Sequence, residues 1–300
     1  MSSVLLAVGA PIVMQILIER GLLLATAIST LVLVSLGLTI IYGFMGVINL
    51  AHGAMLMLGA YIAYTVQSLG LPVLSALIIA PVVVGVVGYL LEISLVKRLY
   101  EDNLKAVLAT WGVAIILQEM VKIIYGTDRR QVAMPFTGSV DVFGAQYPTY
   151  WLFIVVLTVG VLAAVWAFIE YTDTGMKAVA VLENRTMANA MGINSRRMDR
   201  LTFAFGSALA GLGGAVIAPL TSVSSNMGIT WLINSFLVVV IGGVGSILGT
   251  VAGSIFIGGT DQSLSWYFSD NLALAELLLY GIAILVMLLR PEGLIQRVKQ

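Results

Sequence analysis

Long apolar runs dominate this chain, and short polar stretches separate them. The runs cover residues 2–18, 21–45, 53–69, 72–96, 104–125, 149–169, 201–220 and 272–289, and a stretch interrupted by glycines covers 231–260. A helical membrane crossing needs about 20 apolar residues, and the runs do not alternate as the strands of a membrane barrel would. The pattern predicts an all-α membrane protein, a polytopic bundle of about eight spans that forms one transmembrane domain over residues 1–300.

Composition supports lipid as the surrounding solvent. Hydrophobic residues make up 60% of the 300 residues and charged residues 10%, whereas a typical soluble domain carries about 25% charged residues. The net charge of zero gives no indication of a nucleic-acid partner. Cysteine is absent, which excludes disulfides and thiolate metal sites. No basic residue precedes Arg20, so we expect no cleaved signal peptide.

The distribution of Lys and Arg predicts the orientation of the bundle. Segments 97–105 and 170–200 and the tail from Arg290 hold eleven of the fifteen basic residues. Because basic loops stay on the cytoplasmic side of a membrane, we expect these segments and the C-terminus in the cytoplasm. Loops 221–230 and 261–271 are then expected outside.

The stretch 231–260 is therefore expected to enter the membrane and return to the same side. Thirty helical residues extend only about 45 Å, too little for two full crossings and a turn. The sequence predicts a re-entrant hairpin, or two half-helices that meet at Gly242, Gly243 and Gly245. Irregular backbone at membrane depth occurs only inside protein or beside a water-filled cavity. We therefore expect Gly242 and Gly243 near a translocation pathway.

A second interrupted region lies at residues 42–53, which contain three glycines, Asn49 and the single histidine, His52. Gly-broken segments in both halves of a transporter point to a substrate site, although these two regions do not establish an internal repeat. Asn49 and His52 would share one face of a helix. They are expected either to line a solute path or to support the structure, with His52 bonding a backbone carbonyl.

Polar and aromatic side chains also stand out in the run 104–125. Trp111 and Gln118 are seven residues apart and so lie on one helical face, with Thr110 alongside. Tryptophan offers a flat wall with an N–H donor, and glutamine offers both a donor and an acceptor. These groups suit the passage of a small amide. The alternative for Trp111 is a place in the aromatic belt at the membrane interface.

Three acidic residues fall within the apolar runs. Glu92 is expected to pair with a basic residue at 97–98, and Glu119 with Lys122 one helical turn away. Glu276 lies near the expected outer end of the last span. A charge at the bilayer centre is costly, so pairing and closeness to the interfaces explain these acids without a role in substrate binding.

Several stretches resemble one known family. The run 42–61, YGFMGVINLAHGAMLMLGAY, is similar to the signature of the branched-chain amino acid permease family of ABC importers. Three later stretches agree with that family in order: residues 183–214, residues 235–253 and the motif RPEGL at 290–294. Within the family, ATWG at 109–112 and SFLVVV at 235–240 look more like urea permeases.

The resemblance implies a machine of several chains in a bacterial inner membrane. Its other parts would be a second homologous permease, two ABC ATPase subunits and a periplasmic solute-binding protein. The cargo would be urea, a short amide or a branched-chain amino acid, moved by alternating access. The chain has no Gly-Lys dipeptide and hence no phosphate-binding loop. ATP and magnesium would be bound by the ATPase partners, and we expect no cofactor, metal or catalytic residue in this chain.

Segment 170–200 is the expected contact with the ATPases. Within it, ENRTMANAMG at 183–192 combines helix formers, a polar face and a glycine stop. A short helix there would fit a groove of a partner, and an ordinary positive-inside loop is the alternative. The expected coupling residues are Glu183, Asn184, Arg185, Ala190 and Gly192.

Two other functions compete with an importer subunit. An autonomous secondary transporter or channel would need a titratable or carbonyl-rich ion site deep in the bundle, and the sequence gives no convincing one. A membrane-embedded enzyme is disfavoured, because the chain has one histidine, no cysteine and neither an HExxH nor a GxSxG motif.

Overall fold

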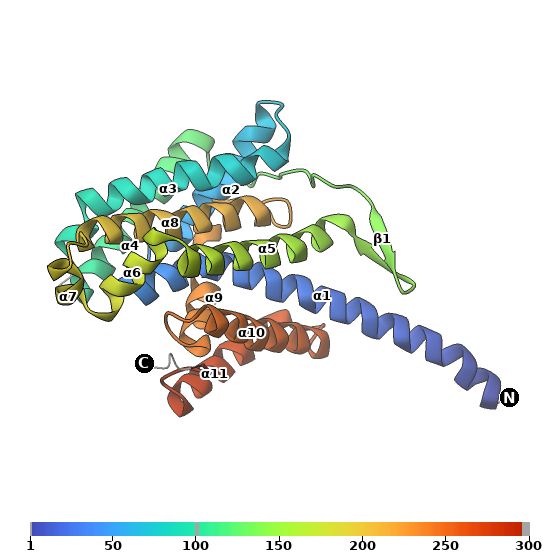
Figure 1. Ribbon diagram of the computed structural model, residues 1–300. Coiled ribbons are helices and arrows are strands. Elements are labelled where there is room, and N and C mark those ends of the chain that lie inside the picture. Colours follow the sequence, from blue (N-terminus) through green and yellow to red (C-terminus); the bar gives the residue numbers. More distant parts are fainter. Residues whose placement is uncertain (1, 100–101, 296–300) are drawn as a thin grey trace.

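A computed structural model describes residues 2–99 and 102–295, with side chains from residue 14 onwards. Helices form almost all of it, and the predicted all-α polytopic bundle is confirmed (Figure 1). The helices are α1 (Ser2–Met45), α2 (His52–Ser68), α3 (Ala76–Ser94), α4 (Asn103–Tyr125), α5 (Thr149–Tyr171), α6 (Asp173–Glu183), α7 (Arg185–Ala190), α8 (Ser195–Ile217), α9 (Met227–Gly242), α10 (Ile247–Tyr267) and α11 (Leu272–Leu289). Two short turns, η1 (Val73–Ser75) and η2 (Val96–Arg98), flank α3, and an antiparallel hairpin, β1 (Ser139–Val142) and β2 (Ala145–Pro148), precedes α5.

Among the described residues, six helices are long and apolar enough to cross a membrane. They belong to α1, α3, α4, α5, α8 and α11, and the bent pair of α9 and α10 counts as a seventh span if it is one unit. The remaining predicted run forms α2, which has only 17 residues. Most of its residues are buried, so α2 is an internal helix of the bundle.

The first two apolar runs form one helix rather than two. α1 has 44 residues, which corresponds to about 66 Å. Glu19, Arg20 and Gly21 between the runs do not end it, because Glu and Arg are good helix formers and one glycine costs only about 1 kcal/mol. Figure 1 shows the first part of α1 extending beyond the bundle, so residues 2–18 continue α1 and are not a separate crossing.

Helix α8 lies at the centre and packs closely on its neighbours through small residues. A Cβ atom added to Gly206 would lie 2.7 Å from the carbonyl oxygen of Gly37 in α1, and one on Gly214 would overlap the carbonyl of Leu56 in α2. Backbones approach this closely only where side chains are absent. The apolar window of α8 is 67% buried, against 17% in α4, α5 and α11. The outer faces of these three helices are therefore free for lipid or partner chains.

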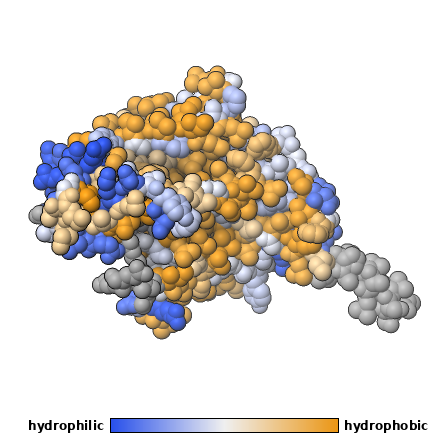
Figure 2. All heavy atoms as spheres, viewed as in Figure 1, coloured by the Kyte–Doolittle hydropathy of each residue, from blue (hydrophilic) through white to orange (hydrophobic). Residues whose placement is uncertain are grey.

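The two ends of the bundle differ in character. α6, α7 and the C-terminal tail lie at one end, and the β1–β2 hairpin lies at the other (Figure 1). Hydrophilic side chains gather at the α7 end, whereas hydrophobic ones cover the middle (Figure 2). Residues 97–98 and 185–200 contribute to one cavity at the α7 end. Two of the basic segments that the sequence assigned to one side thus share one end of the molecule.

Candidate functional site

Helices α2 and α9 begin against each other inside the bundle. A Cβ atom on Gly53 would overlap the carbonyl of Gly228, and one on Gly228 would lie 2.5 Å from the carbonyl oxygen of Gly53. From this contact the two helices run in different directions. Gln67 in the last turn of α2 accepts from the amide of Ala133 (2.6 Å), whereas α9 ends at Gly242 beside the C-terminal tail. We call the contact of these two helix starts the junction.

No side chain caps either helix at the junction. Ala51 precedes α2 and Asn226 precedes α9, and both have a helical backbone with ψ near −7°, whereas capping residues normally have an extended backbone. Within the described residues, the amides of Gly53, Ala54 and Gly228 have no hydrogen-bond partner. The junction therefore combines free N–H donors with the positive ends of two helix dipoles.

A narrow cavity of about 10 Å³ lies at the junction and is lined by Gly53, Gly228, Trp111 and Gln118. The common face predicted for Trp111 and Gln118 is confirmed, because both side chains reach this cavity from α4. The other lining residues are almost all apolar: Leu50, Ala54, Ala114, Ile115, Ile229 and Leu232. Trp111 is 41% exposed, so the cavity lies at an outer face of the bundle. The cavity offers amide donors and one glutamine against an apolar wall.

Asn49, His52 and Thr110 hold the start of α2 in place. The side chain of Asn49 accepts a backbone amide of its own loop (3.0 Å), and His52 donates from Nε2 to the carbonyl of Val34 (2.8 Å). Thr110 accepts from the amide of Leu50 (3.1 Å). Asn49 and His52 do not share a helix, because α2 begins only at His52. His52 bonds a carbonyl, as the supporting role predicts, and a part for these residues in a solute path stays a prediction.

The second interrupted region forms a tight corner between α9 and α10. The two helices are bent by 116°, which confirms two helices meeting at the glycines. Gly243 and Gly245 have φ of +111° and +76°, a region that favours glycine. The amides of residues 294–295 donate to the carbonyls of residues 241–242 at 2.7 and 3.0 Å. The RPEGL tail thus closes the corner, and a role for Gly242 and Gly243 in a solute path stays a prediction.

The predicted coupling segment forms two short helices. α6 ends at Glu183, and Asn184 caps α7 by accepting an amide of its first turn (2.9 Å). α7 ends at Ala190, and Gly192 turns the chain with a φ of +84°. The predicted short helix with a glycine stop is confirmed.

Helix α7 is fixed to the central helix α8 and exposes apolar side chains outward. Arg185 forms an ion pair of 2.5 Å with Asp199 of α8, whose side chain is almost completely buried. Met187 and Met191 are 59% and 77% exposed. Methionine adapts easily to the shape of a partner. The segment therefore presents exposed methionines on a short helix that an ion pair ties to α8.

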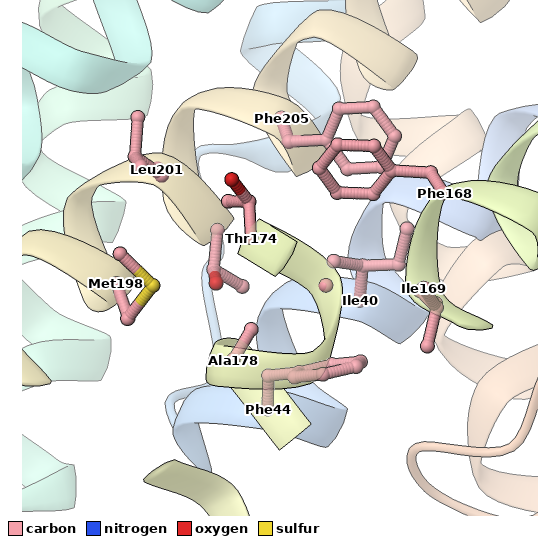
Figure 3. A pocket seen from close by; sticks show the side chains of 11 residues that line it. Ile40, Phe44, Phe168, Ile169, Thr174, Ala178, Met198, Leu201 and Phe205 are labelled. Atoms are coloured by element: carbon pink, nitrogen blue, oxygen red, sulfur yellow. The ribbon is translucent and has the colours of Figure 1, made fainter. Parts of the chain in front are cut away.

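A small apolar hollow of about 30 Å³ lies beside α6, between α1, α5 and α8 (Figure 3). Phe168 of α5 and Phe205 of α8 stack at its edge with ring centroids 4.8 Å apart. Ile40, Phe44 and Met198 form other parts of the wall (Figure 3).

The acidic residues pair as predicted in one case and differently in another. Glu119 binds Lys122 at 2.7 Å, as expected. Glu92 is fully buried and pairs with Arg200 at 3.3 Å rather than with residues 97–98. The prediction is wrong because residues 97–98 lie in the turn beyond α3 and are exposed, while α8 passes directly beside Glu92. In the described ranges, no three histidine or acidic side chains gather as a metal site.

Sequence reasoning missed Gly228 as a partner of the first interrupted region. It placed residues 221–230 outside the membrane, and Val223 does form an isolated antiparallel bridge with Arg130 in the loop before the hairpin. By Gly228, however, the chain has already returned into the bundle and reached Gly53. The available signal was a polar, glycine-containing stretch directly before an apolar run.

Comparison with known proteins agrees with this architecture. A protein-family model described as "Branched-chain amino acid transport system / permease component" matches residues 22–287. BraD, a high-affinity branched-chain amino acid transport system permease protein of Pseudomonas aeruginosa, is 31% identical over 90% of this chain and 92% of its own length. LivH of Salmonella typhimurium, described in the same words, is 29% identical with the same coverage. LivM of Escherichia coli is 26% identical over 93% of this chain and 71% of its own length.

No solved structure matches the chain significantly. The family match covers most of the described bundle, including α2, the junction, the coupling segment and the α9–α10 corner. This chain belongs to the family of permease components of branched-chain amino acid transport systems.

Proposed function

We propose that this chain is the permease subunit of an ATP-powered ABC importer that carries a branched-chain amino acid across a bacterial inner membrane by alternating access. Family membership supports this function, and two relatives are named for branched-chain amino acids. The observation that carries the proposal is the junction, where two uncapped helix starts meet beside an apolar cavity.

The chemistry of the junction matches both parts of such a cargo. An amino acid carboxylate is complementary to free backbone amides at the positive ends of two helices. The apolar wall with Ile115, Leu232 and Trp111 suits a branched aliphatic side chain. The cavity leaves about 10 Å³, close to the space that one water molecule needs, so a cargo would enter only when the two helix starts separate. A binding protein would supply affinity, so contacts here need only be weak.

Energy would enter through the coupling segment. An ATPase partner would bind the exposed face of α7 at Met187 and Met191 and move it as the nucleotide site closes. The Arg185–Asp199 ion pair would pass that movement to α8. Because the glycines of α8 contact α2 directly, a shift of α8 would reach the junction. ATP and magnesium belong to the partner in this scheme.

A second homologous permease would complete the pathway. The junction cavity lies at an outer face of the bundle, where Trp111 and Ile115 are exposed. A partner permease would cover this face and form the other wall of the route. The similarity to LivM of Escherichia coli supports a pair of related permeases.

Urea is a second candidate cargo. The motifs at 109–112 and 235–240 favour it by their similarity to urea permeases. Gln118 could bond both groups of a small amide, and the buried hydroxyl of Ser235 lacks a partner in the described residues. Urea has no carboxylate, so it would make no use of the two helix dipoles.

Uptake of labelled leucine and labelled urea by a strain carrying the complete complex tests the proposal. Leucine uptake without urea uptake supports it, and urea uptake alone would overturn the cargo. The same assay with the permeases reconstituted without ATPases separates the importer from an autonomous transporter or channel. Transport that persists without the ATPases would overturn the importer.

A further inference from the structure

A large polar cavity of about 800 Å³ lies at the α7 end of the bundle, away from the junction. It is formed where α1 and α3 end and where α7 and α8 begin. Its walls carry five cationic side chains: Lys97, Arg98, Arg185, Arg196 and Arg200. They come from three elements that are separated in the sequence, so the fold gathers these charges around one space.

Among the described residues, two of the five cations have an acidic partner and three have none. Arg185 binds Asp199 at 2.5 Å, and Arg200 binds Glu92 at 3.3 Å. Both carboxylates are almost completely buried, so each is already neutralised by its own arginine. No other acidic side chain is among the residues that line the cavity.

Lys97, Arg98 and Arg196 have no acidic partner among the described residues. All three side chains are exposed. Within the described residues, the cavity therefore carries more positive charge than neighbouring acidic side chains balance.

The cavity lies at the ends of membrane helices. Met45 in its wall is the last residue of α1, and residues 97–98 follow α3 directly. Large apolar side chains are exposed on the adjoining helices, at Leu90 of α3 and at Leu104 and Leu108 of α4. A molecule with an anionic head at the cavity and acyl chains along α3 and α4 would meet complementary surface at both parts.

We propose that this cavity binds the headgroup phosphate of an anionic lipid from the membrane leaflet at the α7 end. Arginine binds phosphate oxygens in a planar, bidentate geometry, and Arg98 and Arg196 approach the cavity from different elements. Basic pockets between membrane helices are a known setting for such headgroups. The bound lipid would bridge the turn after α3 and the start of α8.

A lipid fits this cavity better than an acidic segment of a partner protein. The contact surface of α7 is marked by exposed Met187 and Met191, and neither lines the cavity. Lys97 and Arg98 instead follow a membrane span without interruption, which sets them at headgroup level. Lipid binding at this cavity involves neither the cargo nor ATP, so it can be measured without a transport assay.

The test uses the purified full chain in nanodiscs of phosphatidylcholine, with and without phosphatidylglycerol or cardiolipin. Retained lipid is counted by native mass spectrometry for the wild type, for Arg98→Gln/Arg196→Gln and for Lys177→Gln/Arg290→Gln. The control variant removes the same charge from α6 and from the residue that follows α11, neither of which lines the cavity. We expect the cavity variant to lose anionic lipid about tenfold and the control variant less than about twofold, with phosphatidylcholine unchanged.

Four results would overturn the proposal. Equal loss in both variants would mean that only the overall charge matters, and unchanged retention in the cavity variant would remove the site. Displacement of the lipid by millimolar inorganic phosphate would assign the cavity to a free anion. Co-purification with the ATPases adds a further check: loss of the ATPases with full lipid retention would assign the cavity to a protein partner. Melting temperatures of both variants close to that of the wild type show that each is folded.

Discussion

The starts of α7 and α8 differ in kind from the starts of α2 and α9. Asn184 and Asn194 precede α7 and α8 with extended backbone, at ψ of 95° and 96°, and their side chains accept backbone amides at 2.9 and 3.0 Å. Ala51 and Asn226 precede α2 and α9 with helical backbone, and neither forms a cap. Asparagine thus stands at both kinds of start, and the backbone decides whether it caps.

This difference separates fixed helix ends from open ones. A cap occupies the amides that a helix would otherwise direct at a ligand. α7 and α8 are closed in this way at the end where the ATPases are proposed to bind, and α10 and α11 are likewise capped, by Ser246 and Asn271. At the junction the free donors belong to buried residues, Gly53, Ala54 and Gly228, where an unpaired amide is costly. Donors left open at such a cost are suited to a passing solute.

Closing the junction sterically has the largest expected effect. In Gly228→Ala the new methyl group would lie 2.5 Å from the carbonyl oxygen of Gly53, so the two helices must separate by about 1 Å, at a cost of ~1–3 kcal/mol. We expect uptake by the complete complex to fall to background. Gly160→Ala in α5 is the matched control, because no atom lies within 4 Å of its added Cβ. Normal uptake in Gly228→Ala would show that the solute does not pass the junction.

Disrupting the capped region should abolish coupling without removing the protein from the membrane. Gly192 has a φ of +84°, whereas proline requires about −65°. Gly192→Pro also removes an amide that donates to the carbonyl of Asn189 at 3.0 Å. We expect cargo-stimulated ATPase activity to fall to the basal rate while the amount of inserted permease stays normal. Full stimulation would exclude the 183–192 segment from coupling.

A charge at the junction should distinguish the two candidate cargoes. Gln118→Glu places a carboxylate beside the two helix starts, where it would compete with a cargo carboxylate for the same positive ends. We expect the apparent KM for leucine to rise about tenfold, equivalent to ~1.4 kcal/mol. Gln118→Leu controls for loss of the amide and should impair leucine uptake less. If Gln118→Glu impairs the uptake of urea and of leucine equally, the result would argue against binding of a cargo carboxylate at the junction.

Local signals explain which parts of this architecture the sequence predicted. Apolar runs located the spanning helices, and Gly192 and Gly243 marked turns because only glycine adopts their backbone readily. The site itself depends on contacts between distant segments. The packing of α9 brings Gly228 to Gly53, and the packing of α8 brings Arg200 to Glu92. No local sequence pattern near these residues indicates either contact. The sequence also divided α1 into two runs. Here a local signal misled, because Glu19, Arg20 and Gly21 interrupt the apolar pattern although the helix continues through them.

Removing the cap of a single helix should give the smallest effect. It tests whether the capped start of α8 contributes to coupling beyond its contribution to stability. Asn194→Ala removes the side-chain oxygen that accepts from the amide of Arg197, and Asn271→Ala removes the one that accepts from the amide of Leu274. Each substitution should lower the free energy of unfolding by about 1 kcal/mol. Both would be measured as shifts in melting temperature in detergent. Only Asn194 lies between α7 and α8, so only Asn194→Ala should also reduce stimulation of the ATPase, because the link that passes movement to the junction becomes less rigid. Equal loss of stimulation in Asn271→Ala would mean that general stability, and not the closed start of α8, sets the coupling.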